Sequence, residues 1–126
     1  MNIEDLTLKQ IREIQNVGFE KVQATNSFDK KYLGQKVIVR TYSAGVHYGV
    51  LSERCNKEVQ LDSAIRLWYW KGACSLSQLA SEGTKEKSGC KFSVKIGKIL
   101  LTEAIEIIPC TQVACDSIEG VPTWKE

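Results

Sequence analysis

The sequence predicts a single α+β domain, with a mainly antiparallel, meander-like β-sheet, an N-terminal helix and one or two further short helices. Three observations support this fold class. The hydrophobic residues follow a helical period near the start of the chain and change to strand-like alternation at Val37. Strand-like runs then follow one another with short turns between them. The length of 126 residues and the hydrophobic fraction of 43% suit one domain with one core.

The predicted domain, residues 1–126, divides into three stretches. We expect a helical N-terminal segment over residues 1–36, a β-rich core over 37–111, and a short helix with a tail over 112–126. In the first stretch, Thr7 can cap a helix and Gln10 can complete a capping box. Four apolar residues then recur at helical spacing and share one face, namely Leu8, Ile11, Ile14 and Val17.

The β-rich core is predicted to begin with a hairpin. The text "VIVRTYSAGVHYGVLSER" holds two strands joined by the turn "SAG", and the third and fourth strands are predicted in "KEVQLD" and "SAIRLWYW". Ser75 can cap a short helix that ends at Gly83. Strand character returns at Lys91 and is interrupted at Pro109, and a last short helix is expected over residues 111–118.

The charge balance limits the classes of function. Seventeen Lys and Arg against fifteen Asp and Glu give a net charge of +2, too small for a protein that coats long nucleic acids. The first residues carry acids where a signal peptide carries lysines, and no apolar run approaches the ~20 residues that span a bilayer. We therefore expect a cytoplasmic protein that binds no membrane. Five cysteines without a Cys-x-x-Cys pair, and a single histidine, predict free thiols and no metal site.

The stretch "RLWYW" combines one cation with three large aromatic rings. Strand alternation places Arg66, Trp68 and Trp70 on one face. The opposite face is predicted to carry the core residues Leu61, Ser63, Ile65, Leu67 and Tyr69. A guanidinium beside indoles can hold a nucleotide, because a purine stacks on the ring while a phosphate binds the cation. The alternative is that the two tryptophans pack against a helix or a second subunit.

The strand "VIVRTY" repeats this combination, with Arg40 and Tyr42 on one face. The turn after it contains Ser43 and Gly45, and the backbone N–H groups of such a turn can bind an anion. An ordinary hairpin turn is the alternative interpretation of the same residues. His47 follows in "GVHYG" and could stack on a ligand, donate a hydrogen bond or titrate near neutral pH.

The loop "GTKEKSGCKFS" adds hydrogen-bond donors and another aromatic ring. We include Thr84 and Phe92 among the candidate ligand-binding residues, because loops of this kind often close over phosphates. No serine elbow, His-Glu-x-x-His pair or Walker loop occurs in the chain, and His47 has no evident catalytic partner. We therefore predict a binding protein with no catalytic residues, no metal and no cofactor.

Three blocks of the sequence resemble a family of small phage and prophage proteins that block the bacterial Thoeris defence. The blocks are "VIVRTYSAGVHYG", "RLWYWKGACSLSQLASEGT" and "KFSVKIGKILLTEAIEIIPCT", and together they span roughly residues 37–111. The resemblance implies a sponge, the first type of Thoeris anti-defence protein. Such a protein binds cyclic ADP-ribose isomers (glycocyclic ADP-ribose) made by TIR-domain enzymes and holds them uncleaved, so that the Thoeris effector is not activated.

The resemblance also implies partners and a location. Members of the family are homo-oligomers with pockets at subunit contacts, so a dimer or a dimer-based hexamer is expected, and some members bind cyclic oligonucleotides at a separate site. The expected location is the cytoplasm of the infected bacterial host. Two alternatives remain open. One is an enzyme that degrades a cyclic nucleotide with His47 as general acid or base, and the other is a non-catalytic phage structural or DNA-associated adaptor.

Overall fold

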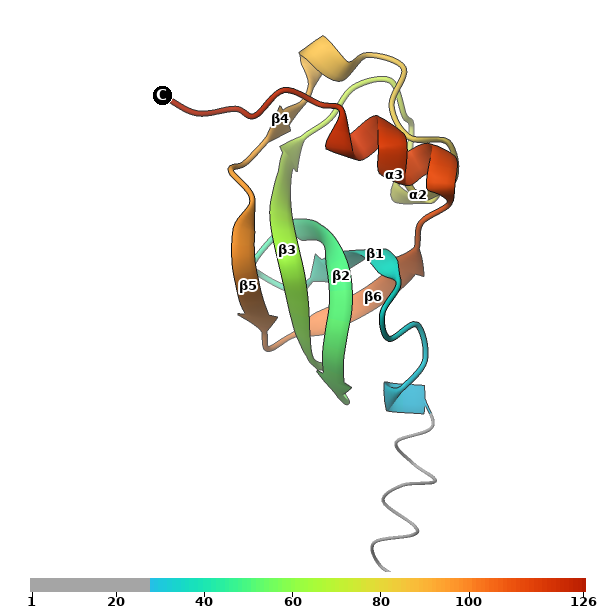
Figure 1. The fold of residues 1–126 in the computed structure, drawn as a ribbon, viewed down its shortest axis with the longest axis vertical. Helices are drawn as coiled ribbons and strands as arrows, with labels where there is room; N and C mark the ends of the chain where they lie inside the picture. Colours follow the sequence, from blue (N-terminus) through green and yellow to red (C-terminus); the bar gives the residue numbers. More distant parts are fainter. Residues whose placement is uncertain (1–27) are drawn as a thin grey trace, which may run out of the picture. The chain divides into compact units, whose positions relative to one another are not determined.

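A computed structural model describes residues 28–126, of which residues 32–126 form one compact unit (Figure 1). The strands of this unit are β1 (Lys36–Thr41), β2 (Val46–Cys55), β3 (Glu58–Tyr69), β4 (Lys91–Phe92), β5 (Ile96–Leu101) and β6 (Ala104–Pro109). Its helices are α2 (Leu76–Glu82), the short 3₁₀ helix η1 (Lys87–Gly89) and α3 (Gln112–Glu119). These elements confirm the predicted α+β class. The helix predicted around residues 7–17 lies outside the described residues.

Every pairing between these strands is antiparallel. The strand order is β4–β3–β2–β1–β6, with β5 also beside β3, and the consecutive strands β1, β2 and β3 form the predicted meander. β5 and β6 lie at opposite edges, although only Thr102 and Glu103 separate them in the chain. The sheet must therefore curl until its two edges approach each other at this connection (Figure 1).

β3 differs from the sequence prediction, because the predicted third and fourth strands form one strand of 12 residues. Its pairing with β2 changes register between Tyr48 and Val50, where β3 contains one residue more than β2. Ser63 lies in this bulge and has a φ of 51°, a left-handed conformation that interrupts regular alternation. Gly49 lies opposite the bulge on β2, where its missing side chain leaves room for the displaced backbone.

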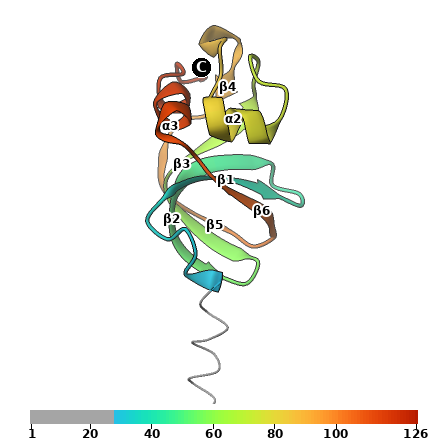
Figure 2. The same ribbon diagram turned by 90° about the vertical axis from the view of Figure 1, so that its right-hand side faces the viewer.

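The buried hydrophobic residues form two clusters. The inner cluster contains Val37, Val39, Leu51, Val59, Leu61, Ala64 and Leu101, all from the strands. The outer cluster combines strand residues with residues of α2 and α3, which cover one face of the sheet (Figure 2): Ile38, Tyr48, Ile65, Leu67, Leu79, Ala80, Cys90, Phe92, Cys115, Ile118 and Val121. Both faces of β1 are therefore buried.

The bulge corrects the predicted faces of β3. Regular alternation predicted that Leu61, Ile65 and Leu67 share one face. In the structure Leu61 belongs to the inner cluster, whereas Ile65 and Leu67 belong to the outer cluster. The extra residue reverses the alternation, so Ala64 and Arg66 face the same side as Leu61.

Both α-helices begin with a side-chain cap, and the cap at Ser75 was predicted from the sequence. The Ser75 hydroxyl accepts a hydrogen bond from the Gln78 N–H at 3.2 Å, and Gly83 ends α2 with a φ of 77°. The Thr111 hydroxyl accepts from the Ala114 N–H at 3.1 Å at the start of α3. All five cysteines are free thiols, as predicted, and two of them are buried. Within the described residues, no helix has the length and hydropathy needed to cross a bilayer.

Glu119 connects the end of α3 to the sheet. Its carboxylate accepts hydrogen bonds from Lys36 Nζ at 2.8 Å and from the Tyr48 hydroxyl at 3.0 Å. The hydrogen bond from Lys36 is the main cause that lowers the pKa of Glu119, and burial acts in the opposite direction. Burial is the main cause that raises the pKa of Tyr48, so this hydroxyl stays protonated and donates to the carboxylate.

Gly49→Ala should destabilise the domain, because a Cβ at this position would lie 2.9 Å from the Asp62 carbonyl oxygen. The contacted atom belongs to the backbone of the bulge, so the bulge itself must shift. We expect the free energy of unfolding in urea to fall by about 1–3 kcal/mol. Gly97→Ala on β5 is the control, because its Cβ would meet open space, and it should change stability by less than about 1 kcal/mol. Equal stability of the Gly49 variant and the wild type would contradict the close approach.

Glu119→Gln should weaken the acid sensitivity of the fold. Because the folded-state pKa of Glu119 is lowered, its stabilising effect is present above the unfolded pKa of about 4.3 and is lost as the pH falls through the folded pKa. The pair is partly exposed, so the variant should be less stable at pH 7 by only about 0.5–1 kcal/mol.

Thermal melting from pH 7 to pH 2 measures this effect. The melting temperatures of Glu119→Gln and the wild type should converge towards the acid end of the range. Glu106→Gln is the matched control. It removes the exposed ion pair with Arg40, and so shows how far the loss of a surface pair alone changes the melting temperature. A difference between Glu119→Gln and the wild type that stays constant over the whole range would exclude a role for the Glu119 charge.

Candidate functional site

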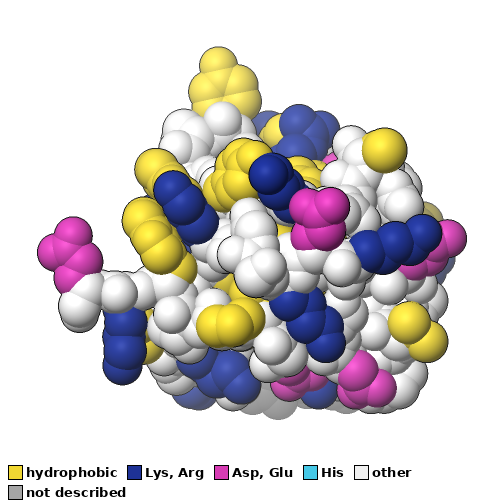
Figure 3. Space-filling view, turned by 90° about the horizontal axis from the view of Figure 1, so that it is seen from above, with side chains coloured by type: hydrophobic (Ala, Val, Ile, Leu, Met, Phe, Trp, Pro, Cys, Tyr) yellow, Lys and Arg dark blue, Asp and Glu magenta, His cyan; other side chains and the backbone are white. Residues whose placement is uncertain are grey.

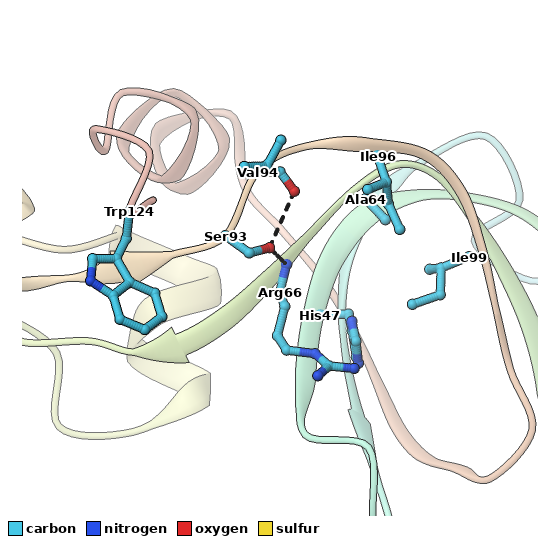
Figure 4. A pocket seen from close by; sticks show the side chains of 8 residues that line it. All are labelled: His47, Ala64, Arg66, Ser93, Val94, Ile96, Ile99 and Trp124. Carbon is cyan, nitrogen blue, oxygen red and sulfur yellow. Dashed lines mark hydrogen bonds between the residues drawn. The ribbon is translucent and has the colours of Figure 1, made fainter. Parts of the chain in front are cut away.

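A cavity of about 400 Å³ opens beside β3 (Figure 4). Its lining residues come from β2, β3, β5, the segment between β4 and β5, and the C-terminal tail: His47, Ala64, Arg66, Ser93, Val94, Ile96, Ile99 and Trp124. The volume lies within the range of about 300–1,000 Å³ that is usual for small-molecule sites. The walls are mainly apolar, and three polar side chains lie among them, which is also the usual composition of a ligand pocket.

Arg66 is held at the cavity by its backbone, which leaves its guanidinium free. Its N–H donates to the Ser93 hydroxyl at 2.9 Å, and its carbonyl oxygen accepts from the Ser93 N–H at 2.9 Å. The side chain extends beside the His47 ring (Figure 4). Among residues 28–126, the two ion pairs are made by other cations, and no hydrogen bond engages this guanidinium. The cavity therefore presents a cation without a described counterion.

His47 lies opposite Arg66 on the neighbouring strand and is only 1% exposed. Its Nε2 lies 2.9 Å from the Ala44 carbonyl oxygen. Because a carbonyl only accepts, Nε2 carries the hydrogen, and Nδ1 holds the lone pair in the neutral ring. Burial is the main cause that lowers the pKa of His47, the bond to Ala44 opposes this shift, and the positive charge of Arg66 adds to it. The imidazole is therefore neutral at pH 7.

Trp124 forms the aromatic part of the cavity wall (Figure 4). The backbone N–H of Trp124 donates to the Phe92 carbonyl oxygen at 2.8 Å, and a parallel bridge joins Phe92 to Thr123. The Trp124 and Trp68 rings are nearly parallel, with centroids 6.4 Å apart and an interplanar angle of 14°. Lys91 Nζ lies 5.4 Å from the Trp124 ring centroid, which is cation–π distance. The tail is thus fixed by backbone and ring contacts together.

The structure brings three of the sequence-predicted residues to this region. His47 and Arg66 line the cavity, and Trp68 stacks on Trp124 at its edge. Trp68 is 62% exposed among the described residues. The predicted combination of a guanidinium with an indole therefore exists on β3, and the bulge at Ser63 turns it to the inner side of the sheet.

Arg40 and Tyr42 do not join this cavity. Arg40 lies on the same face of β1 as Ile38, which belongs to the outer cluster, and its Nε lies 3.3 Å from Glu106 Oε1 on β6. Tyr42 is 77% exposed, and its N–H donates to the Glu103 carbonyl oxygen at 3.0 Å. Arg40 and Arg66 therefore lie on opposite sides of the curled sheet.

Ser43 and Gly45 form an ordinary hairpin turn. Gly45 has a φ of 82°, and its carbonyl oxygen accepts from the Thr41 hydroxyl at 2.7 Å. The same hydroxyl accepts from the Ala44 N–H at 2.8 Å. The turn therefore uses this N–H group internally, which supports the simpler of the two interpretations of the sequence.

Trp70, Thr84 and Phe92 also lie away from the cavity lining. Phe92 is 2% exposed within the outer cluster, and Trp70 packs against that cluster. The Thr84 side chain is buried, where its hydroxyl donates to the Lys71 carbonyl oxygen and accepts from the Glu86 N–H at 3.0 Å. These side chains stabilise the fold beneath the loop and are not presented to a ligand.

Sequence reasoning missed the apolar walls, which are Val94, Ile96, Ile99 and Trp124. A tryptophan in a short polar tail was the available signal, because such a large apolar ring usually packs on something. The isoleucines gave no separate signal, since they look like any strand residues. Among residues 28–126, no group of three or more His, Cys, Asp or Glu residues is arranged to hold a metal ion.

The surface seen from above carries no continuous basic area (Figure 3). Lys and Arg side chains on this face are separated by hydrophobic, acidic and uncharged ones. This distribution agrees with the net charge of +2.

The sequence was compared with protein families and with curated proteins. No curated protein matches the sequence. Residues 34–118 match a family described as a domain of unknown function, DUF6948. The match covers more than half of the 126 residues and includes the cavity residues His47 and Arg66, whereas Trp124 lies beyond it. The chain therefore belongs to the DUF6948 family.

Proposed function

We propose that this protein binds a cyclic ADP-ribose isomer in the cavity at Arg66 and sequesters it without cleavage. The single observation that carries the proposal is the Arg66 guanidinium, which has no described counterion and lies at an apolar cavity beside an indole wall. A cation in such surroundings interacts strongly with an anion, because the apolar walls exclude part of the water that would screen it. The sequence resemblance to Thoeris anti-defence sponges gives the ligand class.

The chemistry of the cavity suits such a nucleotide. Cyclic ADP-ribose isomers contain an adenine, two riboses and a pyrophosphate. The planar guanidinium of Arg66 can bind two phosphate oxygens at once. Lys91, which lies over the Trp124 ring, supplies a second cation within reach of the same ligand. The apolar side chains Ile96 and Ile99 line the cavity where ribose and base carbons can pack.

The polar groups of the cavity favour holding a ligand over cleaving it. The Ser93 hydroxyl accepts from the Arg66 N–H and lies 3.2 Å from the Val94 carbonyl oxygen, to which it donates. The His47 Nε2–H is engaged by Ala44. No carboxylate is among the eight lining residues, so His47 has no acidic partner there to orient it as a general base.

Sequestration requires high affinity. To compete with an effector, the protein must bind at nanomolar concentration, which corresponds to about 12 kcal/mol. Two features of the cavity reduce the cost of ordering on binding: the backbone on either side of Arg66 is fixed through Ser93, and the tail is fixed through Phe92. In the proposed setting the protein is phage-encoded and acts in the cytoplasm of an infected bacterium. There a second subunit in a dimer or hexamer covers the open side of the cavity.

Arg66→Ala should weaken the binding of glycocyclic ADP-ribose by about 10- to 150-fold, because a charge-assisted hydrogen bond contributes about 1.5–3 kcal/mol. The side chain is exposed, so the melting temperature should change little. Arg40→Ala is the matched control, since Arg40 pairs with Glu106 away from the cavity and should bind like the wild type. Isothermal titration calorimetry with glycocyclic and linear ADP-ribose measures both variants. Wild-type affinity in Arg66→Ala would remove this cavity as the binding site.

The proposal also predicts that the ligand is released unchanged. After the protein is saturated, purified and denatured by heat, mass spectrometry should recover intact glycocyclic ADP-ribose in a stoichiometric amount. Consumption of the nucleotide by substoichiometric protein, abolished in His47→Ala, would instead establish the enzymatic alternative. The adaptor alternative predicts no thermal shift with any nucleotide and DNA binding that weakens steeply with salt.

A further inference from the structure

We infer that Trp124, in the C-terminal tail, is the residue on which the base of the bound nucleotide stacks. The inference rests on the proposed function and identifies which aromatic ring performs it. Sequence patterns pointed to Trp68 and Trp70 on β3, because these residues alternate with Arg66. The geometry of the cavity points instead to Trp124, which lies 56 positions after Trp68 and 54 positions after Trp70.

The three tryptophans have different environments. Trp124 lines the cavity together with Arg66. Trp70 packs against the outer cluster, on the helix side of the sheet. Trp68 stacks on Trp124, with ring centroids 6.4 Å apart, and does not itself line the cavity. Trp124 is therefore the indole that a ligand in the cavity contacts, and the Trp68 ring stacks on it.

The position of Trp124 relative to the cation suits a nucleotide. Figure 4 shows the Trp124 ring at one end of the cavity, the Arg66 side chain in the middle, and Ile96 and Ile99 at the other end. A base on the indole therefore has its phosphates directed towards the guanidinium. The Lys91 ammonium lies over the same ring, so a stacking base replaces an exposed cation–π contact and leaves this cation beside the phosphates.

The tail holds the indole in place before the ligand arrives. Val121 is 9% exposed in the outer cluster, which fixes one end of the tail. The other end of the tail is fixed by two backbone contacts. They are the Phe92–Thr123 bridge and the 2.8 Å hydrogen bond from the backbone N–H of Trp124 to the Phe92 carbonyl oxygen. Trp124 is nevertheless 49% exposed, so its ring retains surface on which a base can stack.

The polar groups of the lining explain why stacking is needed. The Ser93 hydroxyl and the His47 Nε2–H are already engaged. Among the lining side chains, the Arg66 guanidinium, His47 Nδ1 and the Trp124 indole N–H remain for the ligand, and the guanidinium suits the phosphates. The edge of a base thus finds few partners in this cavity, and its flat face is the surface that the described residues recognise.

The test compares Trp124→Ala with Trp124→Phe in calorimetric titrations with glycocyclic ADP-ribose. Trp124→Ala should weaken binding by about 5- to 150-fold, the range expected for the loss of one stacked base. Trp124→Phe should retain most of the affinity, because a phenyl ring still offers a flat face. Tyr42→Ala is the matched control, since Tyr42 is an exposed aromatic residue away from the cavity and should bind like the wild type.

Tryptophan fluorescence gives a second readout that does not depend on the alanine variant being folded. Binding should quench the emission of the wild type, and most of this change should disappear in Trp124→Phe while calorimetry still detects the ligand. Unchanged affinity in a folded Trp124→Ala variant, or full quenching in Trp124→Phe, would overturn the inference and leave the proposed function intact. Failure of the wild-type protein to bind the nucleotide at all would overturn both.

Discussion

The bulge at Ser63 determines where the functional groups of this domain lie. It adds one residue to β3 between positions that pair regularly with β2, and this residue reverses the alternation of side chains beyond it. Leu61 can then fill the inner cluster while Ile65 packs beneath the helices. Arg66, which follows Ile65, consequently turns to the inner side and meets His47. Without the bulge, regular alternation would direct the guanidinium to the opposite side of the sheet.

The cavity lies on the inner side beside residues that are too small or too polar to fill it. Leu51, Leu61 and Leu101 close the inner cluster, whereas the lining of the cavity has Ala64 on β3 and the polar His47 beside it. The Ala64 side chain leaves space that a leucine would occupy. β5 contributes isoleucines from the edge of the sheet, and the tail adds Trp124. The cavity thus lies where β3 has a small side chain, whereas leucines fill the inner cluster elsewhere.

Local chemistry could be predicted from the sequence, and long-range geometry could not. Ser75 was recognised as a cap because a hydroxyl before an apolar run acts within one helical turn. The bulge depends on how β2 and β3 pair, and the isolated Gly49 within the β2 run does not say which residue of β3 forms it. Phe92 looked like a loop residue available to a ligand, but its pairing with Leu67 on β3 places it in the outer cluster. The contribution of Trp124 depends on a bridge between Thr123 and Phe92, which are 31 positions apart in the chain.

Arg66 and Arg40 differ in their electrostatic surroundings, because within residues 28–126 only Arg40 is paired with a carboxylate. Arg40 and Glu106 partly neutralise each other on the outer side, so a ligand there would have to compete with a carboxylate. Arg66 has no such competitor among the described residues, and the neutral His47 beside it adds neither attraction nor repulsion. An anion at this guanidinium would have no described carboxylate to displace. Protonation of His47 would place a second positive charge in the same apolar cavity, which is unfavourable until a dianion enters. In the proposed function, a compact anion in this cavity would offset the charge of Arg66 and also the charge that His47 gains on protonation.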